Sequence, residues 1–211
     1  MAKRVYLFSE GGKDDRDLLG GKGANLCEMT TLGLPVPFGF VITTPTCREY
    51  FDNGNRLPTL LEQEYRIALD LVEKKMGARF GDPENPLLFS VRSGAPVSMP
   101  GMMNTILNLG INDEIAEGLA RRTENPRFAY DCYRRFIQMF SDVVLGADAH
   151  ALEARIEAHK EKQGYATDVE MSADDWKQII AEFKTLVEFP EDPFVQLKLA
   201  VEAVFRSWHT P

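Results

Sequence analysis

Hydrophobic and polar positions in the first half of the chain alternate between short strand-like runs and helical spacing. The β-branched and aromatic runs at residues 4–8, 39–43, 87–91 and 105–109 predict strands. Leu26, Met29 and Leu32 recur at three-residue spacing, which predicts a helix over residues 24–32 after a glycine-rich turn at 17–23. Further helices are expected from Thr44 and over residues 60–76.

After Gly110 the strand signal almost disappears, and the pattern becomes a series of helices. Helix boundaries are indicated by capping residues and prolines. The expected helices are 112–121, 126–145, 149–163, 172–188 and 193–209. The pattern therefore predicts an α/β portion of about 110 residues followed by helices.

Composition is that of an ordinary globular protein, with 211 residues, 44% hydrophobic and 27% charged. No apolar run approaches the roughly 20 residues of a membrane span, and the N-terminus does not resemble a secretory signal. The net charge of −8 argues against a nucleic-acid binder. Three cysteines without a CxxC spacing favour a reducing, cytoplasmic compartment.

A glycine-rich segment, LLGGKGANL, places glycines on both sides of Lys22 at the entry to a helix. Glycines allow close backbone approach, and a helix N-terminus favours an anion, so the segment suits a phosphate. The spacing is not that of a Walker A loop. An equally acceptable interpretation is a glycine turn that begins a helix, with Lys22 in solvent.

A second segment, LFSVRSGAPVSMPGMMNTILNL, places Arg92 directly after a predicted strand. Arginine suits bidentate phosphate recognition, and the loop behind it offers backbone amides and methionines with few charges. Such a loop can cover a nucleotide. The alternative is a structural ion pair at Arg92 and methionines that fill the core, which is the commoner role of a methionine cluster.

Five segments in this order closely resemble the pyruvate, phosphate dikinases. They are GGKGANLCEM, VPFGFVITT, FGDPENPLLFSVRSGAPVSMPGMMNTILNLG, NPRFAYDCYRRFIQMFSDVV and AVFRSW. The resemblance extends over the whole chain but only over the beginning of such an enzyme. It implies an α+β fold: an incomplete ATP-grasp-type α/β subdomain at residues 1–111 plus about 198–211, and a mainly helical inserted subdomain at 112–197.

The resemblance also implies a site. Lys22 and Arg92 correspond to residues that contact the nucleotide phosphates and act in catalysis, and the loop at 98–103 covers the polyphosphate with amides of Gly101, Met102 and Met103. The family converts ATP, pyruvate and phosphate to AMP, phosphoenolpyruvate and pyrophosphate through a phosphohistidine. No metal ligand is expected in this chain, so Mg²⁺ would be held outside it. Partners would be the other dikinase domains, in a homodimer, without nucleic acid or membrane.

The chain departs from the family pattern at Asn104, where aspartate is usual, and at Phe38, where proline is usual. His150 and His159 do not lie in the family's phosphohistidine loop, and both are expected at the surface. We therefore expect a fragment that is inactive alone. The alternatives are part of a phosphoenolpyruvate synthase-like dikinase, a stand-alone nucleotide-binding module or a structural helical scaffold.

An aromatic stripe follows one face of the helix expected over residues 126–145. Such a stripe is more often a helix–helix core than a docking surface for the mobile phosphohistidine domain, so a core with a solvated basic edge at Arg134 and Arg135 is the preferred interpretation. The stripe consists of Phe128, Tyr133, Phe136, Ile137 and Phe140.

Overall fold

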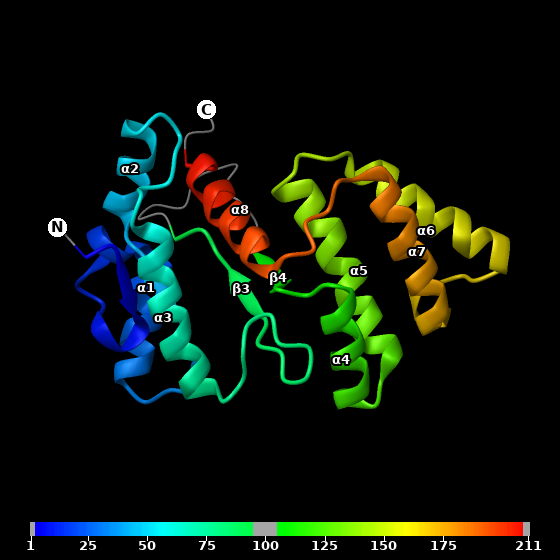
Figure 1. Ribbon diagram of the computed structural model, residues 1–211, viewed down its shortest axis with the longest axis horizontal. Helices are drawn as coiled ribbons and strands as arrows, with labels where there is room; N and C mark the ends of the chain where they lie inside the picture. Colours follow the sequence, from blue (N-terminus) through cyan, green and yellow to red (C-terminus); the bar gives the residue numbers. More distant parts are fainter. Residues whose placement is uncertain (1–2, 95–104, 209–211) are drawn as a thin grey trace. The chain divides into compact units, whose positions relative to one another are not determined.

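The fold is α+β, with predominant helices and two small antiparallel sheets, in a computed structural model that describes residues 3–94 and 105–208 (Figure 1). Over these two ranges each sheet has two strands, and no helix is both long and apolar enough to cross a bilayer. The predicted strands and helices are all found, with ends that differ by a few residues except for the first helix, which begins eight residues earlier than predicted.

The chain forms two compact units, each assembled from separate segments. Unit 1 comprises the described residues of Met1–Ala78, Arg92–Asn104 and Val201–Pro211. Unit 2 comprises Arg79–Val91 and Thr105–Ala200. The predicted division into an α/β subdomain (1–111 plus about 198–211) and a helical subdomain (112–197) stays a prediction. In the two compact units, the β-hairpin residues before 111 belong with the helices that follow them.

Unit 1 contains a two-stranded sheet, two helices that contact the sheet and a further helix that packs on one of them. Strand β1 (Val5–Leu7) runs antiparallel to β2 (Phe40–Ile42), with Val5 opposite Ile42. Both strands are rich in residues that favour a pleated surface. Helices α1 (Arg16–Thr31) and α3 (Leu61–Met76) contact the sheet, α2 (Thr44–Asp52) packs on α1, and a 3-10 turn occupies Phe8–Glu10.

Arg4 fastens β1 to two of these helices. Its guanidinium donates two hydrogen bonds of 2.9 Å to the Glu49 carboxylate on α2 and one of 2.8 Å to Glu64 on α3. The paired geometry is the one in which an arginine–carboxylate contact is strongest. The hydrogen bond from Arg4 lowers the pKa of Glu49, so the pair stays ionised at neutral pH.

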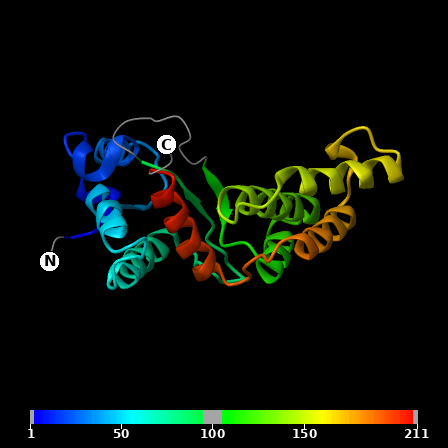
Figure 2. The same ribbon diagram turned by 90° about the horizontal axis from the view of Figure 1, so that it is seen from above.

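Unit 2 consists of a hairpin and a group of helices (Figures 1 and 2). Strand β3 (Phe89–Val91) pairs antiparallel with β4 (Ile106–Leu109). Asn112, Asn125, Asp148 and Ser172 each accept a backbone N–H at a helix start, as good N-caps do. The helices are α4 (Asp113–Thr123), α5 (Pro126–Val143), α6 (Ala149–Gln163), α7 (Ala173–Leu186) and the first half of α8 (Pro193–Arg206), with a 3-10 turn at Asp168–Glu170.

Helix α5 provides the centre of unit 2, because it contacts α4, α6 and α7. Tyr133, Phe136, Ile137 and Phe140 are fully buried, and Phe189 lies edge-on to the rings of the three aromatic residues. Such ring contacts stabilise a core beyond simple area burial. The core interpretation of the stripe is therefore confirmed for four of its five members.

Two residues differ from the interpretation of a buried stripe with a solvated edge: Phe128 of the stripe and Arg134 of the edge. Phe128, in the first turn of α5, remains 47% exposed. Arg134 is buried, so the prediction of a solvated basic edge is wrong at this position and correct for Arg135. Helical spacing alone places Arg134 beside the core, and its carboxylate and hydrogen-bond partners offset the free-energy cost of burying its charge.

A buried glutamine joins α8 to the end of the β3–β4 hairpin. The Gln196 side chain accepts the Gly110 N–H at 3.0 Å and donates to the carbonyls of Ile111 and Pro190 at 3.1 and 2.9 Å. With its amide satisfied in this way, Gln196 is buried without an orphaned polar group. Phe194, two residues earlier, packs edge-on against Phe80.

The predicted helix over residues 24–32 begins earlier and buries another face. Helical residues start at Arg16, and Met29 and Leu32 are exposed. The buried positions in this part of α1 are Gly23, Ala24 and Cys27. Small side chains allow α1 to lie close to the sheet, where a β carbon on Gly23 would contact Val41 at 3.0 Å.

The expectation that His159 lies at the surface is wrong, whereas His150 is exposed as expected. His159 is only 4% exposed, and its Nε2 atom is 2.8 Å from Asp175 in the first turn of α7. Asp175 also accepts hydrogen bonds from the Ser172 hydroxyl and backbone N–H. The acidic residues near His159 in sequence indicated solvent, and its partner comes from the next helix.

Asp175 predicts an acid-dependent loss of stability. Burial raises the pKa of this carboxyl, but hydrogen bonds from Ser172 and His159 outweigh burial and lower the pKa to about 2 from the ordinary 3.8. A depressed folded-state pKa stabilises the protein above the ordinary value, and this contribution disappears as the pH falls from 3.8 toward 2. Asp175→Asn should cost about 1–2 kcal/mol at pH 5 and progressively less toward pH 2 in urea unfolding.

Asp174→Asn is the matched control. Asp174 belongs to the same first turn of α7, is exposed, and has no hydrogen bond or ion pair within the described parts of the chain. Its substitution should change the free energy of unfolding little at any pH. A constant Asp175→Asn effect between pH 5 and 2 would contradict the assignment.

Candidate functional site

The glycine-rich segment contains a break inside helix α1. Gly20 has φ 71° and ψ 167°, a conformation that is essentially restricted to glycine, and helical residues resume after it. Lys22 therefore belongs to the first turn of a helical run over residues 21–31. The predicted turn over residues 17–23 is wrong in extent, because α1 spans Arg16–Thr31 and leaves helical geometry only at Gly20.

The two segments singled out from the sequence meet at this break. A β carbon placed on Gly20 would lie 1.5 Å from the carbonyl oxygen of Gly94 and 2.7 Å from its carbonyl carbon. Only a residue without a side chain permits this contact between two main chains. The structure thereby brings the segment that carries Lys22 against the segment that carries Arg92, two residues before Gly94.

A small hydrophobic cluster packs next to the break at Gly20. Leu19, Ala24 and Cys27 are buried together and are covered by Tyr6, Phe8, Leu18 and Val41. Burial raises the pKa of the Cys27 thiol, so it stays neutral and serves as a packing residue. The Thr44 hydroxyl, at the start of α2, donates to the carbonyl of Asp17 and holds the turn that precedes Gly20.

Lys22 and Arg92 are both exposed, as a ligand-binding role requires. Within residues 3–94 and 105–208, neither side chain has a hydrogen bond or an ion pair. Their charges are therefore not neutralised by the described residues around them. The other predicted site residues, Gly101, Met102 and Met103, together with Asn104, lie outside the described residues.

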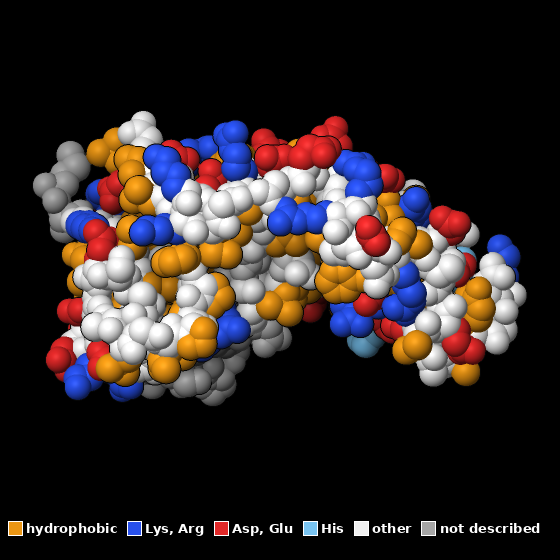
Figure 3. Space-filling view, turned by 90° about the horizontal axis from the view of Figure 1, so that it is seen from below, with side chains coloured by type: hydrophobic (Ala, Val, Ile, Leu, Met, Phe, Trp, Pro, Cys, Tyr) orange, Lys and Arg blue, Asp and Glu red, His pale blue; other side chains and the backbone are white. Residues whose placement is uncertain are grey.

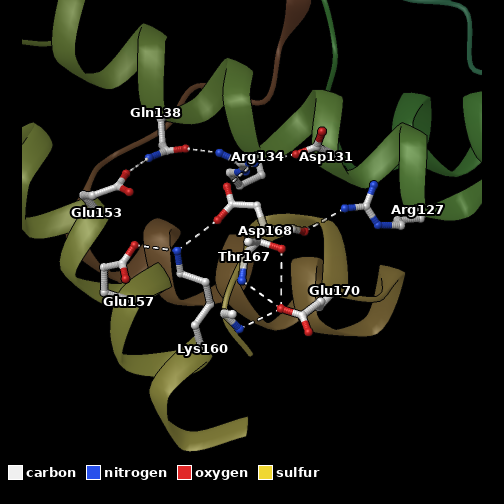
Figure 4. A network of polar contacts seen from close by, with 11 residues as sticks. Arg127, Asp131, Arg134, Gln138, Glu153, Glu157, Lys160, Thr167, Asp168 and Glu170 are labelled. Atoms are coloured by element: carbon white, nitrogen blue, oxygen red, sulfur yellow. Dashed lines mark hydrogen bonds and ion pairs between the residues drawn. The ribbon is translucent and has the colours of Figure 1, made fainter. Parts of the chain in front are cut away.

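A larger charged cluster lies in unit 2, and it is satisfied internally (Figure 4). Arg134 donates to Asp131 at 2.5 Å and Asp168 at 3.3 Å, and it lies over the ring of Trp176 at 4.2 Å. Lys160 lies 3.1 Å from the same Asp168. The labelled side chains point toward one another, so we interpret the cluster as a structural connection between helices rather than a site.

Charges on the face drawn in Figure 3 are mixed, with acidic and basic side chains interspersed. The described side chains drawn there form no broad basic area of the kind that would follow a nucleic-acid backbone. Across the described ranges, no group of three or more His, Cys, Asp or Glu side chains could hold a metal ion. The Lys22–Arg92 region is the best candidate for binding an anion.

Comparisons with known proteins identify the family. Residues 16–70 match the family model described as the pyruvate phosphate dikinase AMP/ATP-binding domain. Over the whole chain, identity is 51% to pyruvate, phosphate dikinase of Clostridium symbiosum. The chain belongs to the pyruvate, phosphate dikinase family. It corresponds to the N-terminal, AMP/ATP-binding part of these proteins.

Other relatives with the same name come from distant organisms. The chain is 50% identical over 98% of its length to the dikinase of Entamoeba histolytica, and 49% identical over 99% to the chloroplastic dikinase of Flaveria trinervia. It covers 25%, 24% and 23% of the three relatives named here, so it spans about a quarter of their length. The residues that match the family model include Gly20 and Lys22, whereas Arg92 lies outside them and within the span that the whole-chain relatives cover.

The sequence pattern did not indicate which residues contact Ser93 and Gly94, the two residues that follow Arg92. Ser93 is fully buried and accepts a hydrogen bond of 2.9 Å from the indole N–H of Trp208, 115 residues later. The segment AVFRSW contributed to the family resemblance, but nothing in its local pattern indicates a contact with Ser93. Gly94 likewise looks like an ordinary loop glycine until its contact with Gly20 is seen.

The Gly20–Gly94 contact predicts an asymmetry between two alanine substitutions. Gly20→Ala should cost about 2–4 kcal/mol in unfolding free energy, because its dihedral angles exclude a β carbon and its β carbon would overlap Gly94. Gly94→Ala is the control, since its β carbon would meet only the carbonyl oxygen of Leu19 at an ordinary 3.8 Å. Urea unfolding of the 211-residue chain measures both, and equal costs would contradict the geometry.

Proposed function

We propose that unit 1 holds the phosphates of ATP within an ATP-grasp nucleotide-binding domain of a pyruvate, phosphate dikinase. The observation that carries the proposal is the Gly20–Gly94 contact, which joins the Lys22 and Arg92 segments. Both cations are exposed, and Lys22 lies at a helix start, an environment that favours a polyphosphate. The family match to an AMP/ATP-binding domain supports the same assignment.

The two cations have different roles in this proposal. Lys22 provides a compact point charge at a glycine-lined helix start, where it can approach phosphate oxygens closely. Arg92 provides two parallel N–H donors that suit charge developing on a transferring phosphoryl group. Amides of Gly101, Met102 and Met103 complete the phosphate cover, as the family resemblance predicts.

The complete dikinase would convert ATP, pyruvate and phosphate to AMP, phosphoenolpyruvate and pyrophosphate. Mg²⁺ would accompany the ATP, but the Lys22–Arg92 pair is cationic and fits an anion rather than this ion. We therefore assign Mg²⁺ ligands and the phosphohistidine to other dikinase domains. Further proposals from the family are a homodimeric complete enzyme and a reducing, cytoplasmic environment, which suits three free cysteines.

The alternatives differ in what they predict for this site. A phosphoenolpyruvate synthase-like enzyme would share the segments that carry Lys22 and Arg92. A stand-alone module would bind nucleotide without turnover, and a structural scaffold would not respond to nucleotide. The relatives named above are dikinases, and we retain the dikinase as the proposed function.

Arg92→Lys tests the proposed role in the complete dikinase polypeptide that contains this chain. Lysine keeps the charge but cannot supply two parallel donors, so the rate of ATP cleavage should fall about 10- to 1,000-fold. Phosphoryl exchange between the phosphohistidine and pyruvate uses a separate site and should be unchanged. Both half-reactions are measured on one preparation by following AMP and pyruvate.

Arg66→Lys is the matched control for this substitution. Arg66 is a partly exposed arginine of α3 in the same unit, and it pairs with Glu62 one turn away. Its replacement should leave both half-reactions unchanged. An equal loss of both half-reactions in Arg92→Lys would indicate a general folding defect, and an unchanged ATP half-reaction would remove Arg92 from the proposed site.

A further inference from the structure

A single hydrogen bond connects the end of the described chain to the residue beside Arg92. The Trp208 indole N–H donates to the Ser93 hydroxyl at 2.9 Å, and both residues belong to unit 1. Ser93 has no exposed surface. Because an indole N–H can only donate, the Ser93 oxygen must accept, which fixes the side-chain rotamer of a residue adjacent to Arg92.

Trp208 is itself held in place by the end of helix α8. The backbone N–H of Trp208 donates to the Phe205 carbonyl at 3.1 Å, and the Ser207 hydroxyl donates to the Val204 carbonyl at 2.7 Å. The Phe205 ring packs against Tyr50 with a centroid distance of 5.4 Å. The hydrogen bond to Ser93 therefore starts from a well-anchored position.

The segment after Arg92 is held from two sides. Trp208 contacts the Ser93 hydroxyl, and Gly20 contacts the Gly94 carbonyl. Between them, these contacts restrain two consecutive residues that directly follow Arg92. A main chain restrained in this way loses less conformational freedom when its neighbouring side chain engages a ligand, which is how preorganisation favours catalysis.

We propose that Trp208 is a positioning residue for Arg92. Through the Ser93 hydroxyl it holds the Arg92 main chain beside the Gly20 break, so that the guanidinium is preorganised for a phosphoryl group. Trp208 touches neither ATP nor phosphate in this proposal. The inference rests on the phosphate-binding role proposed for Arg92, and the experiment separates the two.

The test uses the complete dikinase polypeptide with Trp208→Phe, Ser93→Ala and the double variant. Phenylalanine keeps an aromatic ring but removes the N–H donor, and alanine removes the acceptor. Each single variant should lower kcat/KM of the ATP half-reaction about 10-fold and leave the pyruvate half-reaction unchanged. The double variant should be no worse than either single one, because both remove the same hydrogen bond.

Coupling to Arg92 distinguishes positioning from simple structural support. Adding Trp208→Phe to Arg92→Lys should cost less than about 2-fold further in the ATP half-reaction, since the group being positioned is already altered. Additive losses, or equal losses in both half-reactions, would overturn the positioning role. If Arg92→Lys alone lowers ATP cleavage and neither Trp208→Phe nor Ser93→Ala does, this inference fails while the proposed function stands. An unchanged ATP half-reaction in Arg92→Lys overturns both.

Trp176→Phe is the matched control, because the chain contains only two tryptophans. Trp176 is fully buried in unit 2, and its indole nitrogen has no hydrogen-bond partner among the described residues. The same chemical change there should leave both half-reactions unchanged.

The hydrogen bond itself can be checked in the 211-residue chain by NMR, independently of activity. Of its two indole N–H resonances, Ser93→Ala should shift the Trp208 signal upfield and leave the Trp176 signal in place. An unmoved Trp208 resonance would overturn the proposal even if a variant proved too unstable for kinetics.

Discussion

The candidate site depends on the contact between the main chains of Gly20 and Gly94. This contact requires two features at once: a glycine-only backbone conformation at Gly20 and the absence of a side chain where the two chains touch. It joins two segments separated by more than seventy residues. Without it, Lys22 and Arg92 would belong to unrelated parts of the surface.

The surroundings of that contact are arranged to keep it rigid. Small residues of α1 pack on β2. The Thr44 hydroxyl donates to the turn before Gly20, and the Trp208 indole donates to Ser93, next to Gly94. Each of these restraints satisfies a buried polar group or fills the core, so it stabilises unit 1 as well as the site. The two exposed cations are thus carried on a well-supported backbone, as a preorganised anion site requires.

Unit 2 shows the opposite use of charge. Its arginine and lysine side chains around Asp168 are paired with carboxylates, and Arg134 also lies over the ring of Trp176. Its aromatic core lies around α5. A charge buried with partners stabilises a particular helix arrangement, whereas an unpaired exposed charge is available to a ligand. The difference in pairing, rather than the number of cations, separates the candidate site from the scaffold.

Local pattern was sufficient for the helices and strands, the α+β class, the two segments of the site and the family. These depend on residue spacing, capping and turn residues, which act over a few neighbours. Only the tertiary structure decided that Gly23, Ala24 and Cys27 are buried positions of α1 and that Arg134 and His159 are buried. It also decided that Gly94 lies against Gly20 and that Ser93 accepts a hydrogen bond from Trp208. The physical reason is that burial of a charge or a close backbone contact depends on partners from distant segments, and those partners leave no periodic signal in the sequence.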